Sequence, residues 1–280
     1  MSTTSIEWTD ATWNPVTGCD RVSPGCAHCY ALTLAGRLKA MGQARYQRDG
    51  DPKTSGPGFG LTLHPDKLDE PLRWRQPRMV FVNSMSDLFH EDVPDEFIDR
   101  VFIPMKATRH HTFQVLTKRP ERMAAYMRAV YALEREVIPD PFESPIPNIW
   151  LGTSIENRRF VHRADLLRET PAAVRFISAE PLLGPLVFAD RVYPLPPEYR
   201  GWTWQHTLDL TGIDWLIAGG ESGPRHRPMR VEWVRDLRDA AQTSGTAFFF
   251  KQWGGRTPKA GGRELDGRTW DELPRQAVRT

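Results

Sequence analysis

The stretch MVFVN at residues 79–83 is short, apolar and rich in β-branched and aromatic side chains. A run of this kind is typical of a strand that is buried on both faces. Later stretches of the chain have the same character. They are TFQVL (112–116), IWLGT (149–153), VRFIS (174–178), DWLIA (214–218) and TAFFF (246–250). The sequence therefore predicts a sheet that is covered on both sides.

Stretches between these strands carry apolar residues three and four positions apart, which is the period of a helix packed on one side. They are Asp95–Thr108, Glu121–Val137, Arg158–Glu169 and Val231–Ser244. Alternation of strand and helix gives a parallel sheet with right-handed crossovers. With a short first strand near Trp13–Thr17, we predict an α/β fold, a partial or complete parallel (β/α) barrel. An open doubly wound sheet is the alternative.

No change of composition marks a domain boundary, so residues 1–280 are expected to form a single domain. Polar or proline-rich stretches interrupt the alternation at about 43–78, 138–148 and 185–211. Long loops in a compact domain usually carry function, and we interpret these three as insertions.

The composition is that of an ordinary globular protein, with 40% hydrophobic and 26% charged residues and a net charge of +2. No apolar run approaches the ~18 residues of a membrane span, and the first residues lack the regions of a signal peptide. We therefore predict a cytoplasmic protein without membrane contact. In such a reducing compartment, an odd cysteine count of 3 argues against disulfides and for metal binding or catalysis.

All the cysteines lie within TGCDRVSPGCAHCYA at residues 17–31. Cys26 and Cys29 form a CxxC pair, whose thiolates can reach one metal or cluster, and Cys19 precedes them on the same loop. The next residues, YALTLAGRLKAMG, predict a helix that ends at Gly42. The loop thus enters a helix N-terminus, where the helix dipole favours thiolate charge.

Three interpretations of this cysteine loop are open. A structural zinc would need a fourth ligand, for which His28 and His64 are the candidates. A [4Fe–4S] cluster held by three cysteines would keep one iron free for a substrate or cofactor. The third interpretation is a set of buried structural cysteines without metal.

The cysteine loop, with a short strand before it and a helix and further βα units behind it, resembles the radical S-adenosylmethionine superfamily. Most of the chain is more closely similar to an uncharacterised phage-associated family with a three-cysteine motif, and spore photoproduct lyase is a more distant relative. The motifs that carry this resemblance are GCDRVSPGCAHCYA, SMSDLF, LTKRPERM, LGTSIEN, ISAEPLLG and AGGESGP. The cysteine spacing, C-x6-C-x2-C, departs from the CxxxCxxC that is commoner in the superfamily.

The resemblance implies that Cys19, Cys26 and Cys29 bind a [4Fe–4S] cluster, and that S-adenosylmethionine binds the open iron. One-electron reduction would then yield a 5′-deoxyadenosyl radical, which abstracts hydrogen from a substrate. An electron donor of flavodoxin or ferredoxin type is the implied partner. The relation to spore photoproduct lyase suggests DNA or a nucleotide as the substrate, for repair or modification.

Polar and charged residues follow nearly every predicted strand, at the edge where parallel α/β folds carry their chemistry. The resemblance places Ser84, Ser86 and Asp87 where the superfamily commonly holds the ammonium group of adenosylmethionine. Lys118 is a candidate partner for the carboxylate of that cofactor. The alternative for each of these residues is a helix cap or a surface turn.

Later strand ends contribute further candidates. The resemblance suggests that Ser154 and Glu156 contact the ribose or the carboxylate of adenosylmethionine, and that Glu180 and Glu221 contact the ribose or a substrate. The turn GGESGP matches no phosphate-binding fingerprint, and we expect its glycines to let the backbone approach a cofactor. No catalytic residue and no oligomeric state is predicted.

A non-enzymatic interpretation competes with this one. A zinc-binding, phage-type nucleic-acid-binding protein would account for the cysteines and for the basic residues in several loops. It does not account for the carboxylates and hydroxyls at successive strand ends. The enzyme is therefore the preferred hypothesis.

Overall fold

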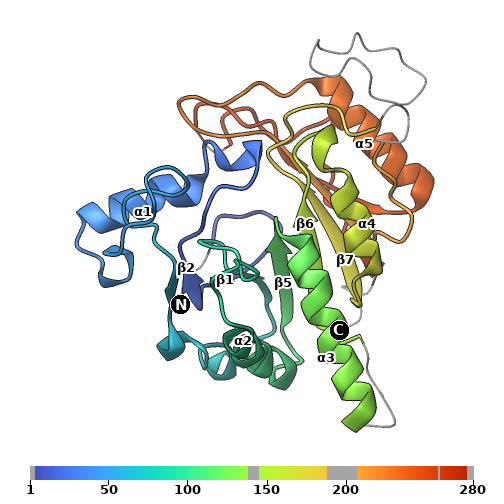
Figure 1. Cartoon of the computed structure of the whole chain (residues 1–280). Helices are drawn as coiled ribbons and strands as arrows, with labels where there is room; N and C mark the ends of the chain where they lie inside the picture. Colours follow the sequence, from blue (N-terminus) through green and yellow to red (C-terminus); the bar gives the residue numbers. More distant parts are fainter. Residues whose placement is uncertain (1–3, 138–144, 188–206, 258, 276–280) are drawn as a thin grey trace. The chain divides into compact units, whose positions relative to one another are not determined.

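The computed structural model describes residues 4–137, 145–187, 207–257 and 259–275 (Figure 1). Parallel strands form a 7-stranded sheet in the order β1-β4-β5-β6-β7-β8-β9, which is also their order along the chain. A doubly wound sheet would reverse its strand order at a switch point, and this sheet does not. The fold is therefore α/β, of the partial parallel (β/α) barrel kind that the sequence predicts.

The strand positions follow the apolar runs of the sequence closely. The bounds are β1 Ala11–Trp13, β4 Met79–Val82, β5 Thr112–Thr117, β6 Ile149–Ser154, β7 Val174–Ala179, β8 Trp215–Gly219 and β9 Ala247–Gln252. Every residue of β6 and β8 is buried, as expected of strands covered on both faces.

The first strand differs from the prediction. Ala11–Trp13 pairs with Val80–Val82 of the parallel sheet. Val16–Thr17 instead forms β2, which pairs antiparallel with β3, Thr62–Leu63. Pro15 separates β1 from β2 and has no N–H to donate to a sheet, which explains why one predicted strand becomes two.

The helices also lie where the helical period predicts them. Their bounds are α1 Tyr30–Ala40, α2 Asp95–Ala107, α3 Pro120–Val137, α4 His162–Glu169 and α5 Val231–Ser244. Single 3₁₀ turns occur at η1 Pro24–Cys26, η2 Ala44–Tyr46, η3 Pro65–Lys67, η4 Pro71–Arg73 and η5 Arg158–Phe160. The predicted helix at Arg158 thus begins as η5, and α4 itself starts only at His162.

The chain separates by its internal contacts into two compact units. The first unit holds residues 1–153 and 169–175, and the second holds 154–168 and 176–280. The single domain predicted for 1–280 stays a prediction. Of the predicted insertions, 43–78 contributes β3 and three 3₁₀ turns to the first unit, whereas 138–144 and 188–206 lie outside the described residues.

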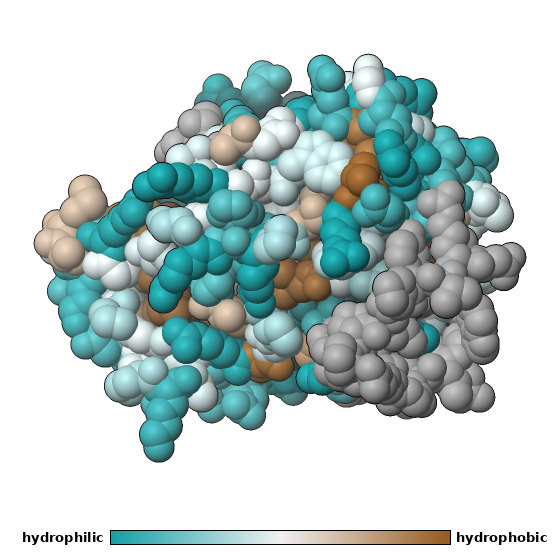
Figure 2. All heavy atoms as spheres, turned by 90° about the horizontal axis from the view of Figure 1, so that it is seen from above, coloured by the Kyte–Doolittle hydropathy of each residue, from teal (hydrophilic) through white to brown (hydrophobic). Residues whose placement is uncertain are grey.

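Each unit has an aromatic core of its own. In the first, Trp13 and Phe113 meet edge to face at 6.0 Å between ring centroids. In the second, Trp215 packs against Phe176 and Phe249. Hydrophilic side chains cover most of the coloured surface seen in Figure 2, and hydrophobic ones show only in small areas there. Across the described residues, no helix combines the length and the apolar character that a membrane span requires.

Candidate functional site

The cysteine loop starts beside the carboxyl end of β4. The Gly18 amide donates to the Met85 carbonyl at 3.0 Å, and Gly18 forms a parallel bridge with Ser86. Gly18 has φ +87°, and a Cβ there would lie 2.4 Å from the carbonyl oxygen of Gly60. Only glycine fits this position, and the tight contact fixes where Cys19 leaves the sheet.

The three cysteines are free thiols, and each is partly accessible to solvent. Cys26 ends the turn η1, and Cys29 immediately precedes α1. The Cys29 amide donates to the Cys26 carbonyl at 3.3 Å, which closes the CxxC turn. Cys29 thus lies at a helix N-terminus, whose free amides carry partial positive charge.

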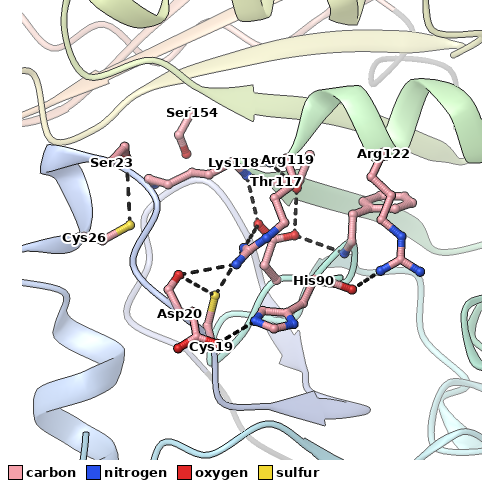
Figure 3. A network of polar contacts seen from close by, with 12 residues as sticks. Cys19, Asp20, Ser23, Cys26, His90, Thr117, Lys118, Arg119, Arg122 and Ser154 are labelled. Atoms are coloured by element: carbon pink, nitrogen blue, oxygen red, sulfur yellow. Dashed lines mark hydrogen bonds and ion pairs between the residues drawn. The ribbon is translucent and has the colours of Figure 1, made fainter. Parts of the chain in front are cut away.

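Cys19 has a different environment from the other two. Burial of its sulfur, together with the nearby Asp87 carboxylate, raises the pKa of Cys19 to about 12. Arg119 opposes both effects, because its Nη1 lies 3.5 Å from the Cys19 sulfur. Figure 3 shows the arginine side chain extended toward Cys19 and Asp20. The described residues thus give Cys19 a cationic partner.

Asp87 lies at the centre of this network. Its Oδ1 accepts from the Thr117 hydroxyl at 2.7 Å and from the Phe89 amide at 3.0 Å. Its Oδ2 accepts from the Lys118 amide at 3.0 Å and from Arg119 Nη1 at 3.2 Å. The carboxylate therefore connects the segment after β4 to the segment after β5.

The other predicted residues of the first unit surround the same strand ends. The Ser84 hydroxyl contacts Asn14 Oδ1 at 3.2 Å, and the Ser86 hydroxyl donates to the Val16 carbonyl at 2.8 Å. Lys118 is half-buried, and its ammonium makes no ion pair with any described residue. The structure thus places Cys19, Ser86 and Asp87 near the same strand ends, and their roles in a site stay predictions.

Predicted residues of the second unit are engaged in ion pairs. Glu156 is fully buried and pairs with Arg163 at 3.2 Å, and Arg163 also donates to the Ser154 carbonyl at 2.8 Å. Glu180 pairs with Lys251 at 3.0 Å and accepts from the Ser178 hydroxyl at 3.2 Å. A cation thus neutralises each of these two carboxylates.

Glu221, which lies in the GGESGP turn, also pairs with a cation, Arg227. Arg227 donates to Glu221 Oε2 from its amide at 2.8 Å and from its Nε at 2.9 Å. A Cβ at Gly220 would lie 2.0 Å from the Trp253 carbonyl oxygen. Gly220 thus lets two backbone segments of the protein meet, and the approach of a cofactor to this turn stays a prediction.

A structural zinc needs four ligands around one point. The described residues contain no group of three or more His, Cys, Asp and Glu side chains gathered in that way. The candidate ligand His64 bonds to the Thr17 hydroxyl at 2.8 Å. A [4Fe–4S] cluster binds each cysteine at a different iron, so its thiolates need to share one loop but not one point.

Sequence reasoning missed Arg119 as a site residue. Arg119 lies directly after β5, in the motif LTKRPERM, and this position at a strand end could have indicated a role in the site. A basic residue after a strand most often solvates a surface, however, and only the structure shows this one turned toward a thiol.

Comparison with solved structures finds spore photoproduct lyase. A cysteine-to-serine mutant of that enzyme matches with 15% identity and a TM-score of 0.44, over 86% of this chain and 62% of that one. Spore photoproduct lyase complexed with dinucleoside spore photoproduct matches with 12% identity and a TM-score of 0.37, over 81% and 59%. The chain thus spans about three fifths of the length of these two structures.

Comparison by sequence gives the family. No curated protein matches the chain. The model of a family described as a protein of unknown function, DUF5131, matches residues 3–274. The chain belongs to this family.

Proposed function

We propose that the chain is an iron–sulfur enzyme that uses S-adenosylmethionine. The observation that carries this proposal is the position of three free cysteines on one loop, which starts beside the end of β4 and ends at the N-terminus of α1. Parallel α/β folds carry their chemistry at this edge of the sheet. A purely structural set of thiols has no need of that position.

Cys19, Cys26 and Cys29 would hold three irons of a [4Fe–4S] cluster and leave the fourth open. When bound, the cluster would supply the electron that cleaves adenosylmethionine to methionine and a 5′-deoxyadenosyl radical. The chain's own part is to orient the ligands and to balance their charge. Gly18 fixes the start of the loop, the N-terminus of α1 lies at Cys29, and Arg119 contacts the sulfur of Cys19.

Residues beside this loop can bind the amino-acid part of adenosylmethionine. The Ser84 and Ser86 hydroxyls each use their proton in the first unit and keep lone pairs that can accept from an ammonium group. Lys118, without an ion pair among the described residues, can hold the carboxylate. Asp87 already accepts four hydrogen bonds, so direct ammonium binding by Asp87 stays a prediction of the resemblance.

The candidates of the second unit stay predictions as ribose or substrate contacts. Glu180 and Lys251 suit this role better than Glu156, because their side chains are 14% and 21% exposed while Glu156 is fully buried. A partly exposed pair can exchange its partner for a ligand at low cost. Ser154 and Glu221 complete the predicted set.

A flavodoxin or ferredoxin would supply the electron. DNA or a nucleotide as substrate, for repair or modification, stays a prediction of the sequence resemblance. Incubating reduced protein and adenosylmethionine with ultraviolet-damaged DNA, undamaged DNA and free nucleotides, and assaying products by mass spectrometry, tests this class directly.

Anaerobic purification and reconstitution with iron and sulfide test the central proposal. We expect a brown protein with about four irons and four sulfides per chain. After reduction with dithionite it should convert adenosylmethionine to methionine and 5′-deoxyadenosine. Cys19→Ser, Cys26→Ser and Cys29→Ser should each lose the cluster and this reaction.

The matched control is Ser23→Ala. The Ser23 hydroxyl lies 3.8 Å from the Cys26 sulfur, so this change alters the loop but removes no thiol. It should keep its iron. Colourless wild-type protein that holds one zinc would contradict the proposal and support the zinc-binding alternative. A brown protein that binds adenosylmethionine but forms no 5′-deoxyadenosine would limit the cluster to a structural role.

A further inference from the structure

We propose that Arg119 is a positioning residue that raises the reduction potential of the cluster by donating a hydrogen bond to the sulfur of Cys19. This inference rests on the proposed function and goes beyond it, because it assigns unequal roles to the three cysteines. Its basis is the contact of Arg119 Nη1 with the Cys19 sulfur at 3.5 Å, which Figure 3 shows.

The contact is specific to one of the three thiols. The sulfur of Cys26 lies near a neutral group, the Ser23 hydroxyl at 3.8 Å. No described cation makes a contact with the sulfur of Cys29. Among the described residues, Cys19 is therefore the proposed ligand whose sulfur has a cation in hydrogen-bonding contact.

Arg119 is held in place from several directions. Besides the sulfur, its guanidinium contacts Asp87 Oδ2 at 3.2 Å and the Asp20 carbonyl at 3.4 Å. Its own amide donates to the Thr117 hydroxyl at 2.9 Å, and that hydroxyl donates to Asp87. Only 12% of the side chain is exposed. The arginine cannot turn away without leaving the Asp87 carboxylate buried and unpaired, which is costly.

Charge balance supports the same geometry. The Arg119 guanidinium contacts the Asp87 carboxylate at 3.2 Å and the Cys19 sulfur at 3.5 Å, so it shares its charge between an acid and a sulfur. A neutral residue at position 119 would leave the Asp87 carboxylate without this cation.

Hydrogen bonds to ligand sulfurs and net charge are among the features that set the potential of an iron–sulfur cluster. Reduction adds one negative charge, which a nearby cation and an N–H donor both stabilise. Arg119 does both from one fixed side chain. Removing it should make the cluster harder to reduce, without removing any of its ligands.

The test measures the midpoint potential of the cluster in reconstituted holoprotein by an anaerobic titration followed by electron paramagnetic resonance. We expect Arg119→Gln to keep about four irons per chain and to have a more negative midpoint than the wild type. Arg119→Lys keeps the charge but loses the forked geometry, and its midpoint should lie between the two.

The matched control is Arg122→Gln. Arg122 is one turn further along α3, and its guanidinium contacts the Val93 carbonyl and Asp95 but no cysteine. Its midpoint should equal that of the wild type. Equal midpoints for wild type and iron-loaded Arg119→Gln would overturn the inference. Should Arg119→Gln fail to fold, an Arg119→Lys midpoint equal to wild type would overturn it instead.

The two proposals fail in different ways. A wild-type chain that binds no iron–sulfur cluster contradicts the proposed function, and the role of Arg119 falls with it. A wild-type chain that carries the cluster, together with unchanged potentials in the Arg119 variants, contradicts the role of Arg119 alone. Folded Arg119→Gln that binds no iron, beside iron-loaded Arg122→Gln, would overturn the role of Arg119 in setting the potential, because the arginine would then be needed for cluster binding itself.

Discussion

Carboxylates follow the strands of both units, but the two units use them differently. In the second unit, Glu156 pairs with Arg163 and Glu180 pairs with Lys251, and neither cation contacts a cysteine among the described residues. In the first unit, Asp87 accepts four hydrogen bonds, and its arginine continues to the sulfur of Cys19. The ion pairs of the second unit neutralise charge locally. In the first unit, the network around Asp87 connects a carboxylate to a thiol through Arg119.

The difference predicts which changes reach the cysteine loop. A change in an isolated pair should affect stability alone. A change in the Asp87 network should affect stability and also the state of Cys19. Measuring the free energy of unfolding together with the iron content separates the two kinds of effect.

The largest effect is expected for Asp87→Ala. It leaves a buried arginine, a hydroxyl and two amides without their acceptor, and breaking a buried ion pair by removing one partner costs about 3–5 kcal/mol. Urea unfolding should show a loss of this size, and the iron content of reconstituted protein should fall. Thr117→Val removes the donor to Asp87 and also the acceptor of the Arg119 amide, and should cost only about 1–2 kcal/mol. Full stability of Asp87→Ala would show that the network does not support the fold.

Glu156→Gln should have a similar but purely structural effect. Glu156 is fully buried, and Glu156→Gln removes the negative charge that pairs with the Arg163 guanidinium, which is 4% exposed. We expect a loss of about 3 kcal/mol in unfolding free energy and an unchanged iron content per folded chain. Folded Glu156→Gln that cannot bind iron would contradict the distinction between the two units.

The strands and the cysteine loop could be predicted from the sequence, but the ion pairs that distinguish the two units could not. Buried apolar runs located β4 to β9, because a strand covered on both faces needs apolar residues at every position. The cysteine loop was evident from the spacing of its thiols. The pairing of carboxylates with cations was not evident from the sequence. Asp87 meets Arg119, and Glu180 meets Lys251, only because separate strands of the sheet align.

The split of the predicted first strand at Pro15 is a second feature that the sequence did not predict. Trp13 and Val16 both suit a strand, but one proline between them sends the chain from a parallel to an antiparallel partner. The long-range partner, Thr62–Leu63, lies in a polar stretch with no strand pattern of its own. Short strands of two or three residues carry too few side chains for periodicity to reveal them.

Lys251→Met should have a smaller effect than either buried pair. It leaves Glu180 with an oxygen that is partly open to water, so its loss of ion pairing is screened. We expect a cost of about 1 kcal/mol. A double-mutant cycle with Glu180→Gln should give a coupling energy of about the same size. A coupling near zero would mean that the pair is interchangeable with water and free to bind a ligand.

The smallest effect is expected at Asp266, whose carboxylate bonds to Arg235 and Arg238 at the surface of the second unit. Hydrogen bonds from these arginines lower the pKa of Asp266 from 3.8 to about 2. Because the folded-state pKa lies below the unfolded one, the stabilisation is present above pH 3.8 and is lost as the pH falls toward 2. Asp266→Asn, which does not titrate, should therefore differ from the wild type in its urea midpoint above that window and converge with it below. Parallel profiles for the two proteins across the window would show that the exposed arginines leave Asp266 as free as it is in the unfolded chain.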